Sequence, residues 1–169
     1  MTFPDIRIRP LSAIKDTPAL QAVLEGAPRY SMNVSGALQP ANAAKEVFCA
    51  VPPDFDAARK FVFGIELHGE LIGCVDVLRG FPTREKAMLG LLLLKEKSQG
   101  KGYGREAYRL FESHLREWPE IEIVRISVVE SNGEVLEFWK RLGFRDTGVR
   151  RAYECGTVAS QAIVMEKAL

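Results

Sequence analysis

Six residues near the middle of the chain read Gln99-Gly100-Lys101-Gly102-Tyr103-Gly104. They follow an apolar run, Met88 to Leu94, and precede an amphipathic stretch that ends at Trp118. This order predicts a buried strand, a glycine loop and the beginning of a helix. The first N–H groups of a helix lack intrahelical partners, and the helix dipole adds positive charge there. The loop is therefore suited to binding a pyrophosphate through its backbone.

The same glycines allow two other interpretations. Gly102, Gly104 and Ala107 fit the G-x-G-x-x-A spacing of a Rossmann-type dinucleotide site, which is a weak signal when it stands alone. The second interpretation is a plain strand-to-helix turn without a ligand. A phosphate-binding loop of the G-x-x-x-x-G-K-S/T type is excluded, because that pattern does not occur in the sequence.

Composition favours one globular domain that spans residues 1–169. Of the 169 residues, 47% are hydrophobic, which is enough for a sizeable core. The 23 Lys and Arg residues nearly balance the 22 Asp and Glu residues, so the formal net charge is only +1. No overall field attracts nucleic acid or an anionic membrane, and we expect neither as a partner.

Cysteine usage and the N-terminus indicate a cytoplasmic protein. Cys49, Cys74 and Cys155 are odd in number and far apart, which argues against a disulfide framework. With two histidines and no Cys-x-x-Cys pattern, no metal site is expected. Residues 1–5 lack the layout of a signal peptide, and no apolar run reaches the length of a membrane span.

Hydrophobic periodicity and turn residues predict the other elements. The first half should contain a strand over 6–9, a helix that begins at Thr17-Pro18 and ends at Gly26, a loop over 28–39 and a helix over 40–50. Three strands should follow over 60–68, 71–78 and 88–94. Because their connections are short, these three strands should pair in antiparallel fashion.

After the glycine loop the pattern changes to alternating helices and strands. It predicts a helix up to Trp118, a strand over 121–129, a helix that Ser131 and Glu134 open with capping-box spacing, and two short strands around residues 155–157. The 121–129 strand should lie parallel to the 88–94 strand through a right-handed crossover. A doubly wound dinucleotide fold alternates from its start, so this order argues against the Rossmann interpretation.

With these elements in place, the chain resembles the GCN5-related N-acetyltransferase (GNAT) family. Residues 99–104 match the family signature Q/R-x-x-G-x-G/A. Asn132, followed by the helix that ends in Phe138-Trp139-Lys140-Arg141-Leu142-Gly143-Phe144, matches a second family block. The resemblance implies an α+β fold with a mixed, mostly antiparallel sheet, helices on both faces and splayed fourth and fifth strands. It also implies direct transfer of acetyl from acetyl-CoA to a primary amine of a small molecule or a protein.

The resemblance also implies roles for individual residues. The N–H groups from Gln99 through Arg105 would hold the pyrophosphate of acetyl-CoA, and the main chain of Leu92 and Leu94 would pair with its pantetheine arm. Asn132 would hydrogen-bond that arm, with a helix cap as the alternative. Trp139 would pack against the arm or the core. Tyr30, in a loop that walls the acceptor site, would contact the substrate or only pack.

Two positions depart from the family pattern. Many members carry a Glu base where this chain has Met88, and a Tyr acid where it has Trp139, whose indole cannot supply a proton near neutral pH.

The residues that could replace the missing base and acid are Asp76, Glu130 and Tyr153. Asp76 is the only charge within 71–78, so it is either a base in the cleft or a structural residue at an edge or paired with Arg79.

Three further expectations accompany this resemblance. The missing Glu and Tyr leave a non-catalytic acyl-CoA-binding or regulatory module as the alternative function. The acceptor is not specified by the near-neutral charge. A homodimer is implied by the habit of the family, with the tail and the exposed sheet edge as its surfaces.

Overall fold

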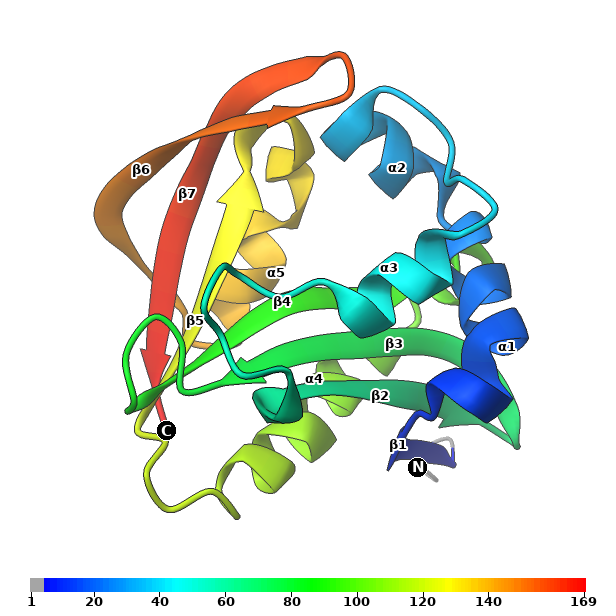
Figure 1. Ribbon diagram of the computed structural model, residues 1–169, viewed down its shortest axis with the longest axis horizontal. Helices are drawn as coiled ribbons and strands as arrows, with labels where there is room; N and C mark the ends of the chain where they lie inside the picture. The colour runs from blue at the N-terminus through cyan, green and yellow to red at the C-terminus, as the bar shows by residue number, and fades with distance from the viewer. Residues whose placement is uncertain (1–4) are drawn as a thin grey trace.

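The computed structural model describes residues 5–169 and shows a seven-stranded sheet with the order β1-β2-β3-β4-β5-β7-β6 (Figure 1). The strands are β1 (Ile6–Pro10), β2 (Lys60–Leu67), β3 (Glu70–Arg79), β4 (Lys86–Leu94), β5 (Ile123–Val129), β6 (Arg145–Cys155) and β7 (Val158–Ala168). Only β4 and β5 are parallel neighbours. The mixed, mostly antiparallel sheet is confirmed, and the Rossmann interpretation is wrong because its fold needs a doubly wound parallel sheet.

Helices cover both faces of this sheet, as predicted. They are α1 (Ala13–Glu25), α2 (Pro28–Ser35), α3 (Ala43–Cys49), α4 (Tyr103–Leu115) and α5 (Leu136–Arg141). Buried side chains of α1 and α3 pack on one face, and those of α4 and α5 pack on the other. Figure 1 shows α3 in front of the sheet and α4 behind it. None of the helices within residues 5–169 is long and apolar enough to span a bilayer.

The strands β4 and β5 pair only at their first residues and then separate, as Figure 1 shows. The paired residues are Lys86 to Met88 with Ile123 to Arg125. Beyond them β4 contains a bulge, since Asp76 lies opposite Leu91 while Val77 lies opposite Leu89, which leaves Gly90 as the extra residue. A bulge bends a strand and increases its twist. The far half of β4 therefore has no strand partner on its β5 side.

The N-terminal elements correct two predictions. Helix α1 begins at Ala13, so Pro18 lies inside it rather than at its start. The reason is a tertiary contact: Asp16 accepts a hydrogen bond from the Ser12 N–H at 2.7 Å and is held by Arg9 of β1.

The next two segments also differ from the prediction. Residues 28–35, expected as loop, form the helix α2, and the helix expected over 40–50 is shorter than predicted. The part of the signal-peptide argument that concerns residues 1–4 lies outside the described residues.

The C-terminal elements correct two further predictions, the capping box and the length of the last two strands. Ser131 and Glu134 form no capping box, and the chain makes the 3₁₀ turn η3 (Glu130–Val135) before α5. Asn132 in that turn has non-helical backbone angles, and its side chain bonds to Asn33 of α2. For this reason the α-helix begins later than the sequence predicted, at Leu136. The two strands after α5 are 11 residues each rather than short, because each can pair with the other along most of its length.

The ion pair of Arg79 and Glu120 fastens the end of β3 to the segment that leads into β5. Arg79 Nη2 lies 2.9 Å from Glu120 Oε2, and this hydrogen bond lowers the pKa of Glu120 to about 2. A depressed carboxyl pKa stabilises the fold above the unfolded pKa, about 4.3, and that contribution is lost as the pH falls toward 2.

We expect Glu120→Gln to lower the free energy of unfolding by about 0.5 kcal/mol at pH 7, because the pair is partly exposed and screened by solvent. The difference from wild type should vanish as the pH falls from 4.5 to 2. Urea denaturation at several pH values measures this. Glu117→Gln, which removes no ion pair within residues 5–169, is the control, and a pH-independent difference would contradict the assignment.

Candidate active site

The separation of β4 and β5 opens a cleft of 890 Å³. Its walls come from α2, β4, the glycine loop, β5, η3 and α5, so residues distant in sequence meet there. Most of the wall is apolar, and polar side chains and backbone groups line the rest of it. Such a concave, largely apolar surface with few polar groups is typical of a ligand site.

The glycine loop exposes backbone N–H groups at one end of the cleft. Gly100 and Gly102 have φ angles of +72° and +83°, and a Cβ at either position would meet nothing within 4 Å. No hydrogen bond among residues 5–169 uses the N–H groups from Gly100 to Arg105. The positive φ angles and the open space let an anion approach these N–H groups closely.

Gln99 has a different role from the predicted one. Its N–H donates to the carbonyl of Glu96 at 3.1 Å, and its side-chain Nε2 donates to the carbonyl of Leu94 at 2.8 Å. Gln99 thus fastens the loop to the end of β4, and the N–H groups left for an anion begin at Gly100. The side chains of Lys101 and Tyr103 do not line the cleft, and Tyr103 packs against the core.

The backbone of β4 presents hydrogen-bonding groups along the cleft. Lys95 N–H donates to the carbonyl of Ile72 in β3 at 2.8 Å. Successive residues of an antiparallel strand point their backbone groups to opposite sides. The backbone groups of Leu94 and Leu92 therefore point away from β3, toward the side that β5 has left. Leu92 offers both groups there, while the carbonyl of Leu94 already accepts from Gln99.

The cleft carries more positive charge than the whole chain suggests. Arg29 of α2, Arg105 of α4 and Arg141 of α5 line it, against one carboxylate, Glu134. None of the three guanidinium groups has an ion-pair partner in the part of the chain that the structure describes. The site therefore suits an anionic ligand although the formal net charge is only +1.

Asn132 and Trp139 both line the opposite wall. Asn132 Oδ1 accepts a hydrogen bond from Asn33 Nδ2 at 3.1 Å, and it caps neither η3 nor α5. Its own amide N–H groups remain for a ligand. Trp139 is 8% exposed and packs edge-to-face against Tyr108 and Phe144, with ring centroids 6.2 and 5.2 Å away. Its main role is packing of this wall.

Asp76 lies on the α1–α3 face of the sheet beside the bulge. It is in a central strand and pairs with Lys60, whose Nζ lies 2.8 Å from Oδ1. The edge position and the Arg79 pair considered from the sequence are both wrong, because Arg79 pairs with Glu120. A Cβ on Gly90 would lie 3.3 Å from Asp76 Oδ2, so the bulge glycine leaves this oxygen room next to the cleft.

Tyr30 of α2 lines the same end of the cleft. Its side chain is largely enclosed, and burial raises its pKa above the ordinary value, with smaller contributions from Tyr153 and Asp76. Its phenol is therefore neutral at physiological pH. Tyr30 thus belongs to the cleft wall, and both its place on the acceptor side and its contact with substrate stay predictions.

Like Asp76, the other two catalytic candidates and Met88 are not among the residues that line the cleft. Glu130 is exposed at the start of η3. Tyr153 donates its hydroxyl to the carbonyl of Val34 at 2.8 Å, and burial raises its pKa to about 12. Met88 is the last residue of β4 that pairs with β5, and it lies opposite Arg125. Because the Glu130 carboxylate faces solvent and the Tyr153 hydroxyl already donates its proton to Val34, we do not propose either residue as the acid or base.

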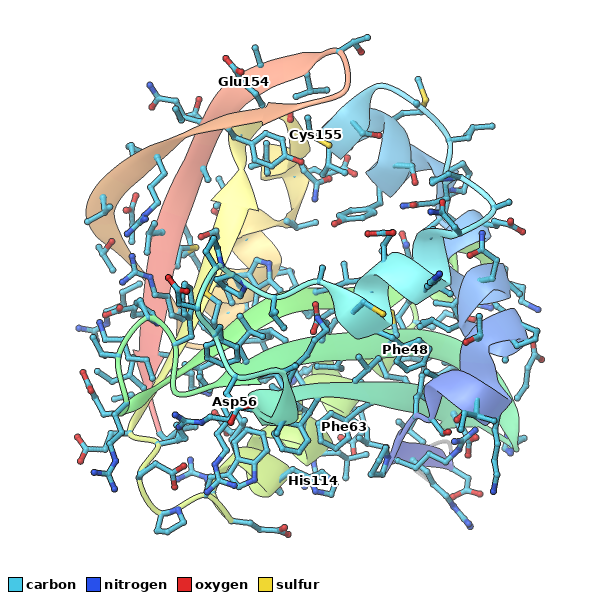
Figure 2. The ribbon with its side chains drawn as sticks, viewed as in Figure 1. Phe48, Asp56, Phe63, His114, Glu154 and Cys155 are labelled. Atoms are coloured by element: carbon cyan, nitrogen blue, oxygen red, sulfur yellow. The ribbon has the colours of Figure 1, made fainter. Side chains whose placement is uncertain are left out.

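The turn between β6 and β7 is bound to the end of α2, and we call this contact the bridge. The N–H of Thr157 donates to the carbonyl of Ser35 at 3.1 Å, beside the bond of Tyr153 to Val34. A Cβ on Gly156 would overlap the same Ser35 carbonyl. Figure 2 shows the neighbouring Cys155 at the hairpin tip, next to α2. The bridge joins two segments that are distant in sequence, and it includes Val34, which lines the cleft.

We expect Gly156→Ala to open the bridge, because the new methyl group has no room and the φ of +55° is unfavourable for alanine. Amide exchange of Thr157 should accelerate at least tenfold, as measured by hydrogen exchange. Gly148→Ala is the matched control, since that glycine has a φ of +81° but open space around its Cβ. Equal acceleration in both variants would mean that backbone strain, not the contact with α2, is responsible.

Comparison with known proteins supports what this geometry suggests. A sequence model of the Acetyltransferase (GNAT) domain matches residues 5–145. Among solved structures, an acetyltransferase from Thermus thermophilus is 25% identical, with a TM-score of 0.75 and 97% of each chain covered. A search of curated proteins finds no match.

Two more distant structures share the fold. The ribosomal-protein-S18-alanine N-acetyltransferase from Escherichia coli is 18% identical, with a TM-score of 0.67 and coverage of 96% of this chain and 93% of that one. The spermidine N-acetyltransferase from Vibrio cholerae, in complex with CoA and spermine, is 15% identical, with a TM-score of 0.73 and coverage of 96% and 95%. The chain belongs to the GNAT acetyltransferase family.

Proposed function

We propose that the protein is an N-acetyltransferase that moves an acetyl group from acetyl-CoA directly to a primary amine. The observation that carries this proposal is the continuity of two binding surfaces. The unpaired edge of β4 leads straight into the N–H groups that begin at Gly100. The first surface suits an extended amide-containing arm, which pairs like an added strand, and the second suits a pyrophosphate.

The residues present fit acetyl-CoA along its whole length. The N–H groups from Gly100 to Arg105 would hold the pyrophosphate, and the guanidinium groups at the cleft would add charge complementarity. Leu92 and the N–H of Leu94 would bind the pantetheine arm from one side, and the amide of Asn132 from the other. When bound, acetyl-CoA supplies an activated acetyl group as a thioester.

Asp76 is the residue we propose as the base. An amine must be neutral to attack a carbonyl, so a carboxylate near the nitrogen helps by accepting its proton. Asp76 Oδ2 lies beside the bulge glycine, which lines the cleft, and the acceptor nitrogen would reach it there directly or through one water. No protein acid is required for the leaving thiol, because its pKa of about 8.5 lies close to neutrality. Trp139 therefore needs only to pack.

The acceptor belongs to one of two chemical classes. Structures with this fold include an enzyme named for an alanine of a ribosomal protein and one named for spermidine. For this chain we propose a primary amine of a small molecule or of a protein, in the cytoplasm. A homodimer remains a prediction.

Calorimetry followed by an amine screen tests the proposal. Acetyl-CoA and CoA should bind with micromolar affinity, and a panel of small amines and N-terminal peptides should show thiol release with at least one member. A folded protein that fails to bind acetyl-CoA would refute the proposal. Tight binding without turnover across the panel would favour the second candidate, a non-catalytic acyl-CoA-binding module, to which Met88 and Trp139 in place of the family's Glu and Tyr point.

A further inference from the structure

A lysine shielded from solvent stands beside the proposed base. Lys60 begins β2, and its side chain is 4% exposed, against 20% for Asp76. Among the cations in ion pairs of residues 5–169, Lys60 is the most buried. Val62, two residues along β2, lies directly opposite Asp76, so all three side chains share the α1–α3 face.

This pair is costly if it serves only the fold. Taking two charges out of water carries a large desolvation penalty, and apolar residues of similar size would often be at least as stable there. The neighbours of Asp76 on its face, Val62, Cys74 and Leu91, are apolar and pack in the core. A charged pair in such surroundings therefore calls for an explanation other than stability.

The arrangement of the two carboxylate oxygens provides one. Oδ1 is bound by Lys60, and no described hydrogen bond uses Oδ2. Oδ2 faces the space that Gly90 leaves by lacking a side chain. Gly90 lines the cleft, and the bulge places it next to Asp76 rather than in register with the ladder. Oδ1 is thus held by Lys60, and Oδ2 is left without a described partner beside Gly90.

We infer that Lys60 is a positioning residue that keeps the carboxylate of Asp76 ionised and directs Oδ2 toward the nitrogen of the acceptor amine. This inference depends on the proposed function. The acceptor ammonium loses one proton to Oδ2, and its lone pair then attacks the thioester carbonyl. The C–N bond forms as the C–S bond breaks, a second nitrogen proton neutralises the departing thiolate, and Oδ2 returns its proton to solvent.

The electrostatics around Asp76 support this role. Burial raises the pKa of Asp76, and the hydrogen bond and charge of Lys60 oppose that rise. The titratable groups that face it are Lys60 from β2, Tyr30 from α2 and Cys74 from β3. Burial raises the pKa of both Tyr30 and Cys74, so both are neutral at physiological pH. Lys60 is therefore the one charge, among described residues, that favours the ionised carboxylate.

The pH dependence of kcat/KM in the Lys60 variants tests the inference. Lys60→Met should raise the pKa of the acidic limb by at least one unit. It should lower kcat/KM about tenfold at pH values below the wild-type limb, where one pKa unit is a tenfold change in the ionised fraction. Lys60→Arg, which keeps the charge, should stay within about threefold of wild type. Asp76→Asn should lose about 100-fold or more and show no such limb. An unshifted limb in Lys60→Met would overturn the inference.

A double variant covers the case in which Lys60→Met does not fold. Lys60→Met/Asp76→Asn removes both charges, so it leaves neither one buried alone. If Lys60 acts through Asp76, the double variant should match Asp76→Asn within about twofold, and a further loss in the double variant would overturn the inference. Acetyl-CoA binding by calorimetry should be unchanged throughout. Loss of binding or turnover in wild type itself would instead count against the proposed function.

Discussion

Replacing Gly102 by glutamate is expected to abolish acetyl-CoA binding, with a rise in Kd of at least 100-fold. Gly102 precedes α4 in a left-handed conformation, and the space beyond its Cα is open to the cleft. A glutamate there places a carboxylate among the N–H groups that begin at Gly100. It would occupy the anion site and repel the pyrophosphate, because both are negatively charged. Calorimetry with acetyl-CoA measures the effect.

Gly69→Glu is the matched control for this experiment. Gly69 has a φ of +80°, close to the +83° of Gly102, and its Cβ would likewise meet nothing within 4 Å. It lies in the turn between β2 and β3, away from the cleft. Both variants therefore carry the same backbone strain and the same added charge. If the two bound acetyl-CoA equally well, the glycine loop would not be the pyrophosphate site.

Replacing Phe111 by alanine is expected to cost about 4 kcal/mol in the free energy of unfolding. Phe111 is fully buried in α4 and packs against the rings of Phe63 and Tyr108, with centroids 6.0 and 6.3 Å away. Phe63, which lies in β2, also packs against the ring of His114 in α4, and both residues are labelled in Figure 2. The cavity left by the ring would loosen α4, whose N-terminus carries the glycine loop.

Urea denaturation followed by circular dichroism measures this loss. Leu110→Ala, on the same helix but only partly buried, is the control and should cost about 1 kcal/mol because less apolar surface is removed from the core. Equal losses for the two variants would show that burial of the Phe111 ring in the core does not govern the stability of α4. If acetyl-CoA binds the folded protein as proposed, it should raise the melting temperature of both variants.

Much of the fold could be predicted from local sequence signals. The glycine loop, the buried run before it and the amphipathic helix after it are adjacent in the chain, so their order was readable. The His68-Gly69 turn has positive φ at both residues, as a two-residue hairpin requires. Short connections then required antiparallel β2, β3 and β4, and the helical connection required a parallel β5.

Some local signals were available and were missed. Helix α2 begins with Pro28 in its first position and ends at Gly36, whose φ is +71°. Proline at the start and glycine just past the end are the expected punctuation of a helix. The start of α1, in contrast, could not be predicted from local signals, because it depends on the contact of Asp16 with Arg9, which lies in β1. No local pattern reveals that contact.

The sequence by itself determined the family, the class of fold and the glycine loop before a helix, because each depends on residues that are neighbours in the chain. The tertiary structure alone decided how the cleft and the surroundings of Asp76 are assembled. Lys60 meets Asp76 through strand register, Gly90 is set beside them by a bulge, and the bridge joins α2 to the β6–β7 turn. It also gathered three arginines from α2, α4 and α5 at one cleft. Burial and charge are properties of what surrounds a residue, and those surroundings exist only once distant segments have packed.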